Sequence, residues 1–213
     1  MRVAPEGRRV IRVVAMGCVM VAALGVVTGH PWLVVPAVVG AVFSCWFFRD
    51  PEREPPADPR LVVSPADGRV LAVTRVAEND FLRCPTTRVS IFMSIFDVHV
   101  NRSPVGGTIE QIRHTPGKFR AAFADKSSDE NERNAMILND GDRRYLIVQI
   151  AGAVARRIVN RRSEGDTVDR GERYGMIMFG SRVDVYLPAD HVVRARPRMR
   201  VRAGTSVIAE VPA

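Results

Sequence analysis

The sequence has very few lysines for its length, and it lacks the patterns of common nucleic-acid-binding proteins. Lys118 and Lys126 are the only lysines among 213 residues, so the formal net charge of +8 comes almost entirely from arginine. No basic run is interleaved with aromatic residues and no helix-turn-helix pattern occurs, which argues against a nucleic-acid partner. A basic protein beside an anionic bilayer is the simpler interpretation of this charge.

Metal-ligand and disulfide patterns are also missing. The four histidines are scattered and form no His-x-His pair, so no metal site is predicted. The three cysteines, Cys18, Cys45 and Cys84, have no motif spacing, and two of them lie in apolar runs. We therefore expect no disulfide framework, which fits a protein that faces the cytoplasm.

The longest uncharged stretch runs from Val13 to Phe48 and is interrupted at residues 28–31. It divides into two apolar segments of roughly 17 residues, each about 26 Å long as a helix, near the lower limit for crossing a ~30 Å hydrocarbon core. Arginines lie at both ends, at positions 2, 8, 9 and 12 and at positions 49 and 53. Residues 13–48 are predicted as a membrane helical hairpin after a basic tail, residues 1–12, with both ends in the cytoplasm. A buried or merely interfacial helical pair is the alternative.

Residues 49–60 are rich in proline and charge, which predicts a linker to a domain formed by residues 61–213. Short β-branched runs between turn signals follow, and they predict a mainly β (α+β) fold, a small barrel or sandwich. These runs are 61–63, 69–76, 88–93, 108–112, 145–150, 154–159, 176–179, 183–187 and 207–211. Residues 114–134 are the least regular, and we expect a loop or short helices there.

Two segments, residues 165–171 and 201–207, look alike, because both place glycines and valines as if at tight strand corners. Such corners are typical of the barrel-sandwich folds of biotin and lipoyl carriers. Neither segment contains the lysine that a carrier domain must modify, which argues against carrier function.

The Gly180-Ser181 pair lies between two apolar strand-like runs. A serine in this position can attack the preceding carbonyl, cut the chain and become a pyruvoyl group, although Gly-Ser alone is an ordinary turn. Asp67 and His99 supply a carboxylate and an imidazole, which complete the set that activates a serine. Alone, Asp67-Gly68 is a hairpin-turn signal, and a single strand histidine is usually a core or surface residue.

From about residue 47 to its end, the chain resembles the short-form, prokaryotic type of phosphatidylserine decarboxylase, with the family's motifs in the family's order. The matching segments are residues 47–51, 64–68, 92–105, 116–119, 125–126, 130–133, 149–152, 155–159 and 170–188. The Phe-Gly-Ser-Arg-Val-Asp block that begins at Phe179 is the most specific of them.

This resemblance implies an enzyme that matures itself and needs no metal. Ser181 matches the serine that becomes the covalent pyruvoyl cofactor, and Gly180 matches the last residue of the larger chain, residues 1–180. The smaller chain, residues 181–213, is expected to stay attached as a heterodimer. Asp67 and His99 match the acid and base that help the serine attack. Longer members carry a second histidine where this chain has Arg102, so that work falls to His99 or to another group.

The resemblance also implies the reaction. The pyruvoyl group forms a Schiff base with phosphatidylserine and releases CO2, which gives phosphatidylethanolamine at the cytoplasmic face of the cell membrane. Candidate substrate-binding residues are Arg102, His114, Lys118 and Arg120. The sequence does not separate this substrate from a related ether-linked serine phospholipid, and assembly beyond the heterodimer stays open.

Two other protein classes share some of these sequence features. A non-enzymatic, membrane-anchored barrel-sandwich binding module predicts an intact chain and no role for Ser181. A zinc endopeptidase with a related Phe-Gly-x-Arg motif requires metal-ligand spacing that the sequence lacks.

Overall fold

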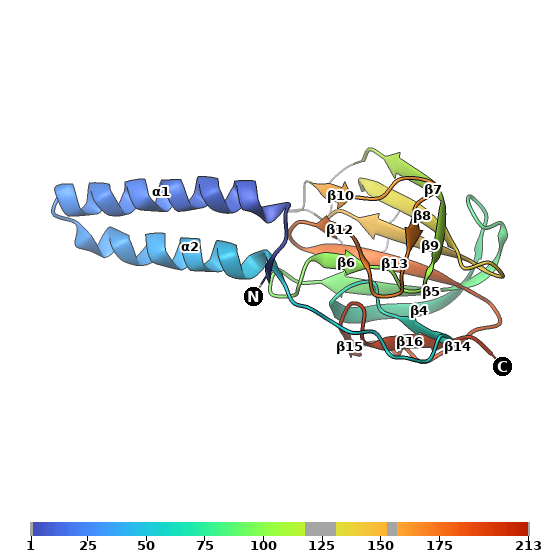
Figure 1. Ribbon diagram of the computed structural model, residues 1–213. Helices are drawn as coiled ribbons and strands as arrows, with labels where there is room; N and C mark the ends of the chain where they lie inside the picture. The colour runs from blue at the N-terminus through green and yellow to red at the C-terminus, as the bar shows by residue number, and fades with distance from the viewer. Residues whose placement is uncertain (1, 118–130, 153–156, 213) are drawn as a thin grey trace. The chain divides into compact units, whose positions relative to one another are not determined.

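The protein is described here by a computed structural model that covers residues 2–117, 131–152 and 157–212. The chain divides into two compact units, Met1–Glu52 and Arg53–Ala213. The first unit is a helical hairpin of α1 (Gly7–Val27) and α2 (Val34–Phe47), joined by a short 3-10 helix, η1 (Pro31–Leu33) (Figure 1). A two-stranded ribbon of β1 (Arg2–Val3) and β2 (Arg49–Asp50) closes its open end. The predicted hydrophobic helical hairpin is therefore confirmed.

Helix α1 begins earlier than the apolar run, so three of the flanking arginines (Arg8, Arg9 and Arg12) lie within its first turns. By length and composition, α1 is apolar enough to cross a membrane, and α2 is a shorter apolar helix. Large apolar side chains on both helices are exposed, among them Val19 at 68% and Val38 at 54%. Surfaces of this kind are unusual in water and are suited to lipid.

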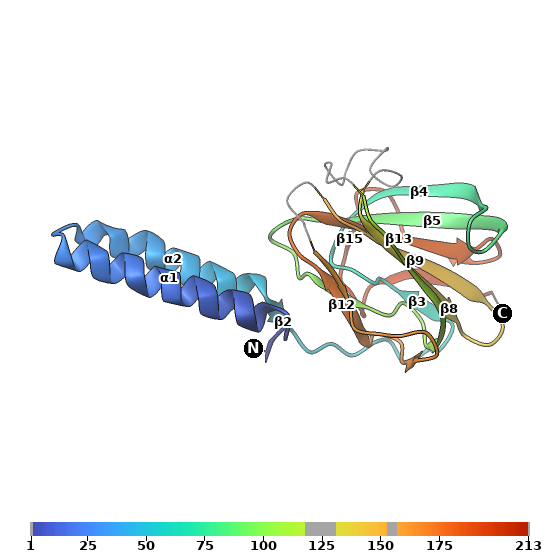
Figure 2. The ribbon, with the colours of Figure 1, turned by 90° about the horizontal axis from the view of Figure 1, so that it is seen from above.

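The second unit is built around a curled, half-barrel sheet of eight antiparallel strands (Figure 1 and Figure 2). In sheet order these strands are β11 (Thr167–Val168), β7 (Gly107–Thr115), β8 (Arg133–Asn139), β9 (Arg144–Ile150), β13 (Ser181–Pro188), β5 (Cys84–Met93), β4 (Gly68–Glu78) and β15 (Arg200–Val201). One three-stranded sheet contains β10 (Ile158–Asn160), β12 (Arg173–Ile177) and β6 (Val100–Arg102). The other contains β14 (Val192–Val193), β16 (Val207–Glu210) and β3 (Leu61–Val63). The mainly β, barrel-sandwich-like prediction is confirmed.

The main core fills the inside of the curled sheet, with Ile91, Ile147 and Val183 fully buried at its centre. A smaller apolar cluster covers the outer face of β8 and β9, where Phe81 and Leu82 from the β4–β5 connection pack against it. Strand β8 is consequently buried on both faces from Asn134 to Leu138. The sequence did not predict this strand because Ile137 is its single β-branched residue, so it does not form a β-branched run.

Two corners of this unit repeat each other. After β3, the Ser64 hydroxyl donates to the Ala66 carbonyl at 2.7 Å, and after β6 the Ser103 hydroxyl donates to the Val105 carbonyl at 2.6 Å. The corners also exchange backbone bonds, because Val63 N–H donates to the Pro104 carbonyl and Arg102 N–H donates to the Pro65 carbonyl. The two segments that looked alike in the sequence complete these corners. Gly204 N–H donates to the Ser64 carbonyl, and Gly171 N–H donates to the Ser103 carbonyl.

A glycine ends each corner and opens the following strand. Gly68 and Gly107 have φ angles of 152° and 153°, and each is followed by a register shift two residues later. A Cβ atom would lie 2.0 Å from the Phe92 carbonyl oxygen at Gly68 and 2.2 Å from the Asn139 carbonyl oxygen at Gly107. Backbone approaches this close admit glycine alone.

Several local predictions were wrong. Asp67-Gly68 does not form a hairpin turn but lies in the corner between β3 and β4, which belong to different sheets. Residues 114–115 and 133–134 are strand rather than loop or helix, because β7 and β8 pair as far as Thr115 and Arg133. Phe179 lies beyond the end of β12. Residues 118–130 and 153–156 lie outside the described residues, so the rest of the predicted loop and the start of the 154–159 run are untested.

Candidate active site

Ser181 is the first residue of β13, in the middle of the large sheet. It lies opposite Met93 of β5, and none of its surface is exposed. Its hydroxyl donates to the Met93 thioether sulfur at 3.5 Å. A thioether is a weak acceptor, so this contact orients the hydroxyl without holding it strongly. The arrangement keeps the serine oxygen away from bulk water.

The backbone just before Ser181 is unusual. Phe179 has a φ of 58°, a left-handed conformation that is uncommon for a bulky residue, and Gly180 has a φ of 20°. Residues held in such sparsely populated conformations cost roughly 1–3 kcal/mol and cluster at functional sites. Among the described residues, its two chain neighbours aside, no heavy atom lies within 4 Å of the position that a Cβ atom on Gly180 would occupy. The strained link therefore lies immediately before the buried serine.

The next residues of the Phe-Gly-Ser-Arg-Val-Asp block form a buried ion pair. Arg182 Nε donates to Asp184 Oδ1 at 2.6 Å, and Arg182 Nη2 donates both to Asp184 Oδ2 at 2.8 Å and to Ser90 Oγ at 2.9 Å. Both charged side chains are at least 95% buried. This ion pair stabilises the strand that follows Ser181. The Arg182 guanidinium is bound to Asp184 and Ser90 within the protein.

His99 is fully buried directly before β6. Its carbonyl accepts a hydrogen bond from Ile177 N–H at 3.4 Å, and Ile177 ends the strand that leads to Phe179, Gly180 and Ser181. On its other side, His99 follows Met93 across one short turn. The segments that carry His99 and Ser181 are thus joined both through Met93 and through Ile177.

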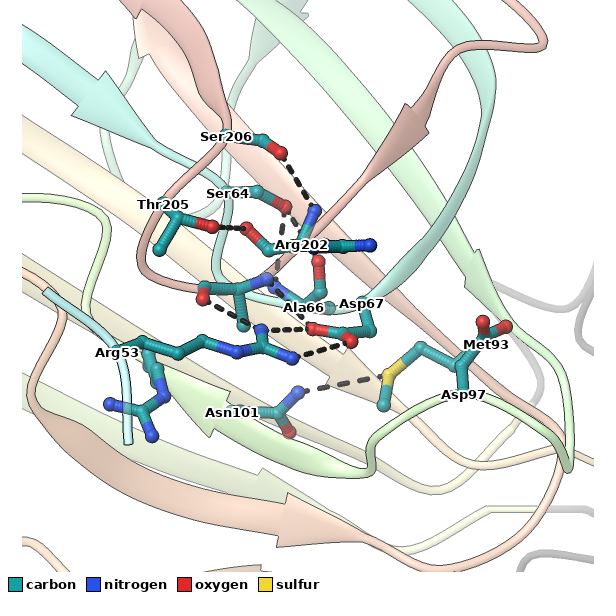
Figure 3. A network of polar contacts seen from close by, with 12 residues as sticks. Arg53, Ser64, Ala66, Asp67, Met93, Asp97, Asn101, Arg202, Thr205 and Ser206 are labelled. Atoms are coloured by element: carbon teal, nitrogen blue, oxygen red, sulfur yellow. Dashed lines mark hydrogen bonds and ion pairs between the residues drawn. The ribbon is translucent and has the colours of Figure 1, made fainter. Parts of the chain in front are cut away.

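Asp67 is held by Arg53, a residue that the sequence analysis used only as a flanking charge. The two Arg53 Nη atoms donate to the two carboxylate oxygens, with a distance of 2.8 Å for Nη2–Oδ2, and Ala203 N–H donates to Oδ1 at 2.8 Å (Figure 3). Arg53 also donates to the Ala203 carbonyl at 2.8 Å. In the described part of the chain, these are the hydrogen-bond partners of Asp67, and no direct hydrogen bond joins it to His99.

A buried chain of amide side chains also leads to Ser181. Asn101 Nδ2 is 3.7 Å from the same Met93 sulfur that accepts the Ser181 hydroxyl (Figure 3). Gln149 Nε2 donates to Asn101 Oδ1 at 2.9 Å, and Asn134 Nδ2 donates to Gln149 Oε1 at 3.1 Å. Sequence reasoning missed these residues, and the available signal was an isolated amide, such as Gln149, within an otherwise apolar strand.

The four candidate substrate-binding residues have different positions. Arg102 is 97% buried and its Nη1 donates to the Gly171 carbonyl at 3.0 Å. His114 is half-exposed at the end of β7, where its Nε2 lies 3.7 Å from Glu132 Oε1. Lys118 and Arg120 lie outside the described residues. Arg102 is thus part of the corner structure, and the roles of the other three stay predictions.

Comparison with known proteins gives a consistent result. The family model for phosphatidylserine decarboxylase matches residues 41–209. A protein of Symbiobacterium thermophilum is 49% identical over 183 residues, 85% of each chain, and one of Syntrophus aciditrophicus is 44% identical over 176 residues, 82% of this chain and 83% of the relative. A protein of Solidesulfovibrio magneticus is 42% identical over 213 residues, 97% of this chain and 95% of the relative. Each of the three is named phosphatidylserine decarboxylase proenzyme.

The match of the family model includes both repeated corners, the strained Gly180–Ser181 link and the buried strand that follows it. The chain belongs to the phosphatidylserine decarboxylase family.

Proposed function

We propose that the chain is a proenzyme that cuts itself between Gly180 and Ser181 and then decarboxylates phosphatidylserine to phosphatidylethanolamine. The observation that carries this proposal is the buried Ser181 directly after the two left-handed residues Phe179 and Gly180. Family membership and the proenzyme names of three relatives support it.

Maturation begins when the Ser181 oxygen attacks the Gly180 carbonyl. The peptide C–N bond breaks and an ester forms, with His99 as the base that accepts the hydroxyl proton and returns it to the freed Ser181 nitrogen. The Ser181 Cα proton is then removed and the Cβ–Oγ bond breaks, so that the larger chain leaves with a carboxylate on Gly180. The remaining dehydroalanine tautomerises and takes up water, which releases ammonia and leaves a pyruvoyl group. Relief of the backbone strain before Ser181 favours the first step.

The surroundings of Ser181 fit such a group. A pyruvoyl group is small and neutral, and the site offers a fully buried serine position, a thioether and the amide of Asn101. When it is formed, the keto group supplies an electron sink for loss of CO2 from the amine-bearing carbon of the substrate. The roles of the chain are to exclude water around Ser181 and to hold a proton donor near it, for which His99 is the candidate.

Both products of the cleavage are expected to stay together. The smaller chain, residues 181–213, contains β13, β14, β15 and β16. Strand β13 is bonded to β5 along its whole length and to β9 over most of it. Breaking the link before Ser181 leaves these ladders intact, which supports a stable heterodimer.

The helical hairpin supports a location at the membrane. Residues 13–48 are uncharged except for the titratable His30, and arginines lie at both ends of this stretch. By the positive-inside rule we expect both ends in the cytoplasm, which supports a catalytic unit that meets lipid head groups on that face.

Purified protein reconstituted in phosphatidylserine vesicles tests the reaction directly. We expect release of CO2 and formation of phosphatidylethanolamine, and loss of both in the Ser181→Ala variant. Ser163→Ala is the control, because Ser163 is an exposed serine of the same unit that follows Arg162 rather than a glycine. Absence of both products with the cleaved wild-type protein would overturn the proposed reaction.

A further inference from the structure

An exposed apolar turn follows β5 in the catalytic unit. Ile95 and Phe96 are 39% and 65% exposed, although side chains of this type are most often buried. The turn is well fixed, because the Asp97 carboxylate accepts hydrogen bonds from the Ser94 N–H at 2.9 Å and from its hydroxyl at 2.7 Å. The Asp97 N–H in turn donates to the Ser94 carbonyl at 3.0 Å. Internal hydrogen bonds therefore hold two apolar side chains at the surface.

A basic segment, residues 196–202, lies beside this turn. Arg200 Nη1 is 3.6 Å from Asp97 Oδ1, which joins the two segments. The basic segment is anchored on β4, where Arg198 N–H donates to the Val70 carbonyl and Val70 N–H donates to the Met199 carbonyl. Its exposed arginines are Arg196, Arg198, Arg200 and Arg202.

Arginines of this surface lie next to one another, where their like charges repel. Arg200 lies directly opposite Arg69 in the β15–β4 ladder, so both exposed side chains leave the same face of the sheet. Like charges in this relation repel each other. Among the described residues, Asp97 is the one carboxylate in an ion pair with this group. The remaining arginines have no carboxylate partner among the described residues, so an anionic partner outside the domain would stabilise them.

We propose that this surface, defined as Ile95, Phe96, Arg69 and the basic segment 196–202, docks on an anionic phospholipid bilayer independently of the helical hairpin. Apolar side chains enter the headgroup boundary while neighbouring arginines bind lipid phosphates, the combination that interfacial segments use. A nucleic acid would also be anionic, but the apolar helix α1 of the same chain, long enough to cross a membrane, favours a bilayer as the partner.

The position of the surface deepens the proposed function, on which it rests. Met93, the last residue before the apolar turn, is the ladder partner of Ser181, and His99 follows the turn closely. Docking at residues 94–97 brings the bilayer to the same edge of the sheet as the reacting residues. A lipid head group then has only a short path to the site, while its acyl chains stay in the membrane.

The test uses the full chain with Cys18, Cys45 and Cys84 replaced by alanine and one new cysteine carrying an environment-sensitive fluorophore. Phe96→Cys places the label on the proposed surface, and Asp142→Cys places it on the exposed β8–β9 turn as a matched control. The protein is mixed with vesicles of phosphatidylcholine and phosphatidylglycerol in which the acyl chains are brominated. Phosphatidylglycerol supplies negative charge without being a serine lipid, so turnover does not disturb the signal.

We expect strong quenching of the label at position 96 and little at position 142. Replacing Arg198 and Arg200 by glutamine should weaken the quenching at position 96, by about fivefold in lipid affinity per arginine. Low quenching of the label at both position 96 and position 142 would overturn the proposal. Quenching at position 96 that is as strong on purely neutral vesicles as on anionic vesicles would overturn the role of the arginines. The mass of the denatured chains, measured on the same samples, reports cleavage separately, so failure of docking is distinguishable from failure of the proposed function.

Discussion

At the scale of single residues, the repeated corners show which side chains the fold itself requires. Both corners contain a serine and a proline and end in a glycine, but the position before that glycine is Asp67 in one and Gly106 in the other. The second corner closes without a carboxylate, so the turn does not need one. This comparison weakens the structural explanation of Asp67, which the sequence alone could not separate from the functional one.

The first prediction concerns Arg53, which binds both oxygens of Asp67. Arg53→Gln leaves a nearly buried carboxylate without its charge partner, a change that costs about 3 kcal/mol. We expect slower appearance of the 181–213 fragment and a lower Tm in detergent. Arg60→Gln is the control, because Arg60 forms an exposed pair with Asp58 and such pairs contribute little. Identical cleavage rates for wild type and Arg53→Gln would contradict a role for this pair.

The second prediction concerns the sulfur of Met93. Met93→Leu keeps the volume of the side chain, so its cost in stability should stay below about 1.5 kcal/mol. It removes the acceptor of the Ser181 hydroxyl, and we expect cleavage to slow by about threefold, the loss of one weak hydrogen bond. Met136→Leu makes the same change in the core of β8 and should cleave at the wild-type rate. If both variants cleave alike, Met93 is only a core residue.

At the scale of elements, the sequence predicted strands that alternate or have clear turn signals at both ends. Leu61–Val63 was predicted with its observed bounds, and most other runs were extended by a few residues. Strand β8 was missed because it contains a single β-branched residue, Ile137. Phe179 was placed in a strand because an apolar side chain gives no sign of a left-handed backbone. The likeness of segments 165–171 and 201–207 was visible in the sequence. The pairing of the corners at Ser64 and Ser103 was not, because two short motifs far apart in sequence carry no sign that they exchange backbone hydrogen bonds.

The third prediction tests these corners through their glycines. Gly107→Ala places a Cβ atom against the Asn139 backbone and strains the φ angle, so we expect a loss of about 3 kcal/mol and a Tm lower by roughly 8 °C. The adjacent Gly106→Ala is the control, because its Cβ atom would meet its nearest neighbour at 3.6 Å, an ordinary contact. The Tm values are compared in the Ser181→Ala background, where every variant is expected to be one intact chain. A Gly107→Ala protein as stable as Gly106→Ala would contradict the close approach.

At the scale of the whole molecule, composition and charge predicted more than local patterns did. The uncharged run and its flanking arginines predicted the helical hairpin, which the structure contains. The site was harder to predict, because its residues come from distant strands and only a shared fold brings them together. Arg53 and Asn101 were not selected, since nothing in their local sequence distinguishes them from solvated or core polar residues. Gln149 offered one signal, an isolated amide within an otherwise apolar strand.

The fourth prediction concerns attachment to the membrane. We expect the wild-type protein to stay in the membrane pellet after an alkaline carbonate wash. Val19→Arg combined with Val38→Arg puts a charge near the middle of each helix, at about 3 kcal/mol per arginine, and should move protein to the supernatant. Val192→Arg adds the same charge at an exposed position of the β unit and should leave the pellet unchanged. Complete extraction of the wild type by carbonate would contradict a spanning hairpin.

The most direct test of the central claim is the denatured intact mass of protein purified from membranes, wild type beside Ser181→Ala. We predict that the wild type gives two chains divided between Gly180 and Ser181, and that the 181–213 fragment carries the mass of a pyruvoyl group in place of its amino-terminal serine. Ser181→Ala should give one intact chain. If the folded wild type is also one intact chain, as the variant is, the result would contradict self-cleavage and with it the pyruvoyl mechanism.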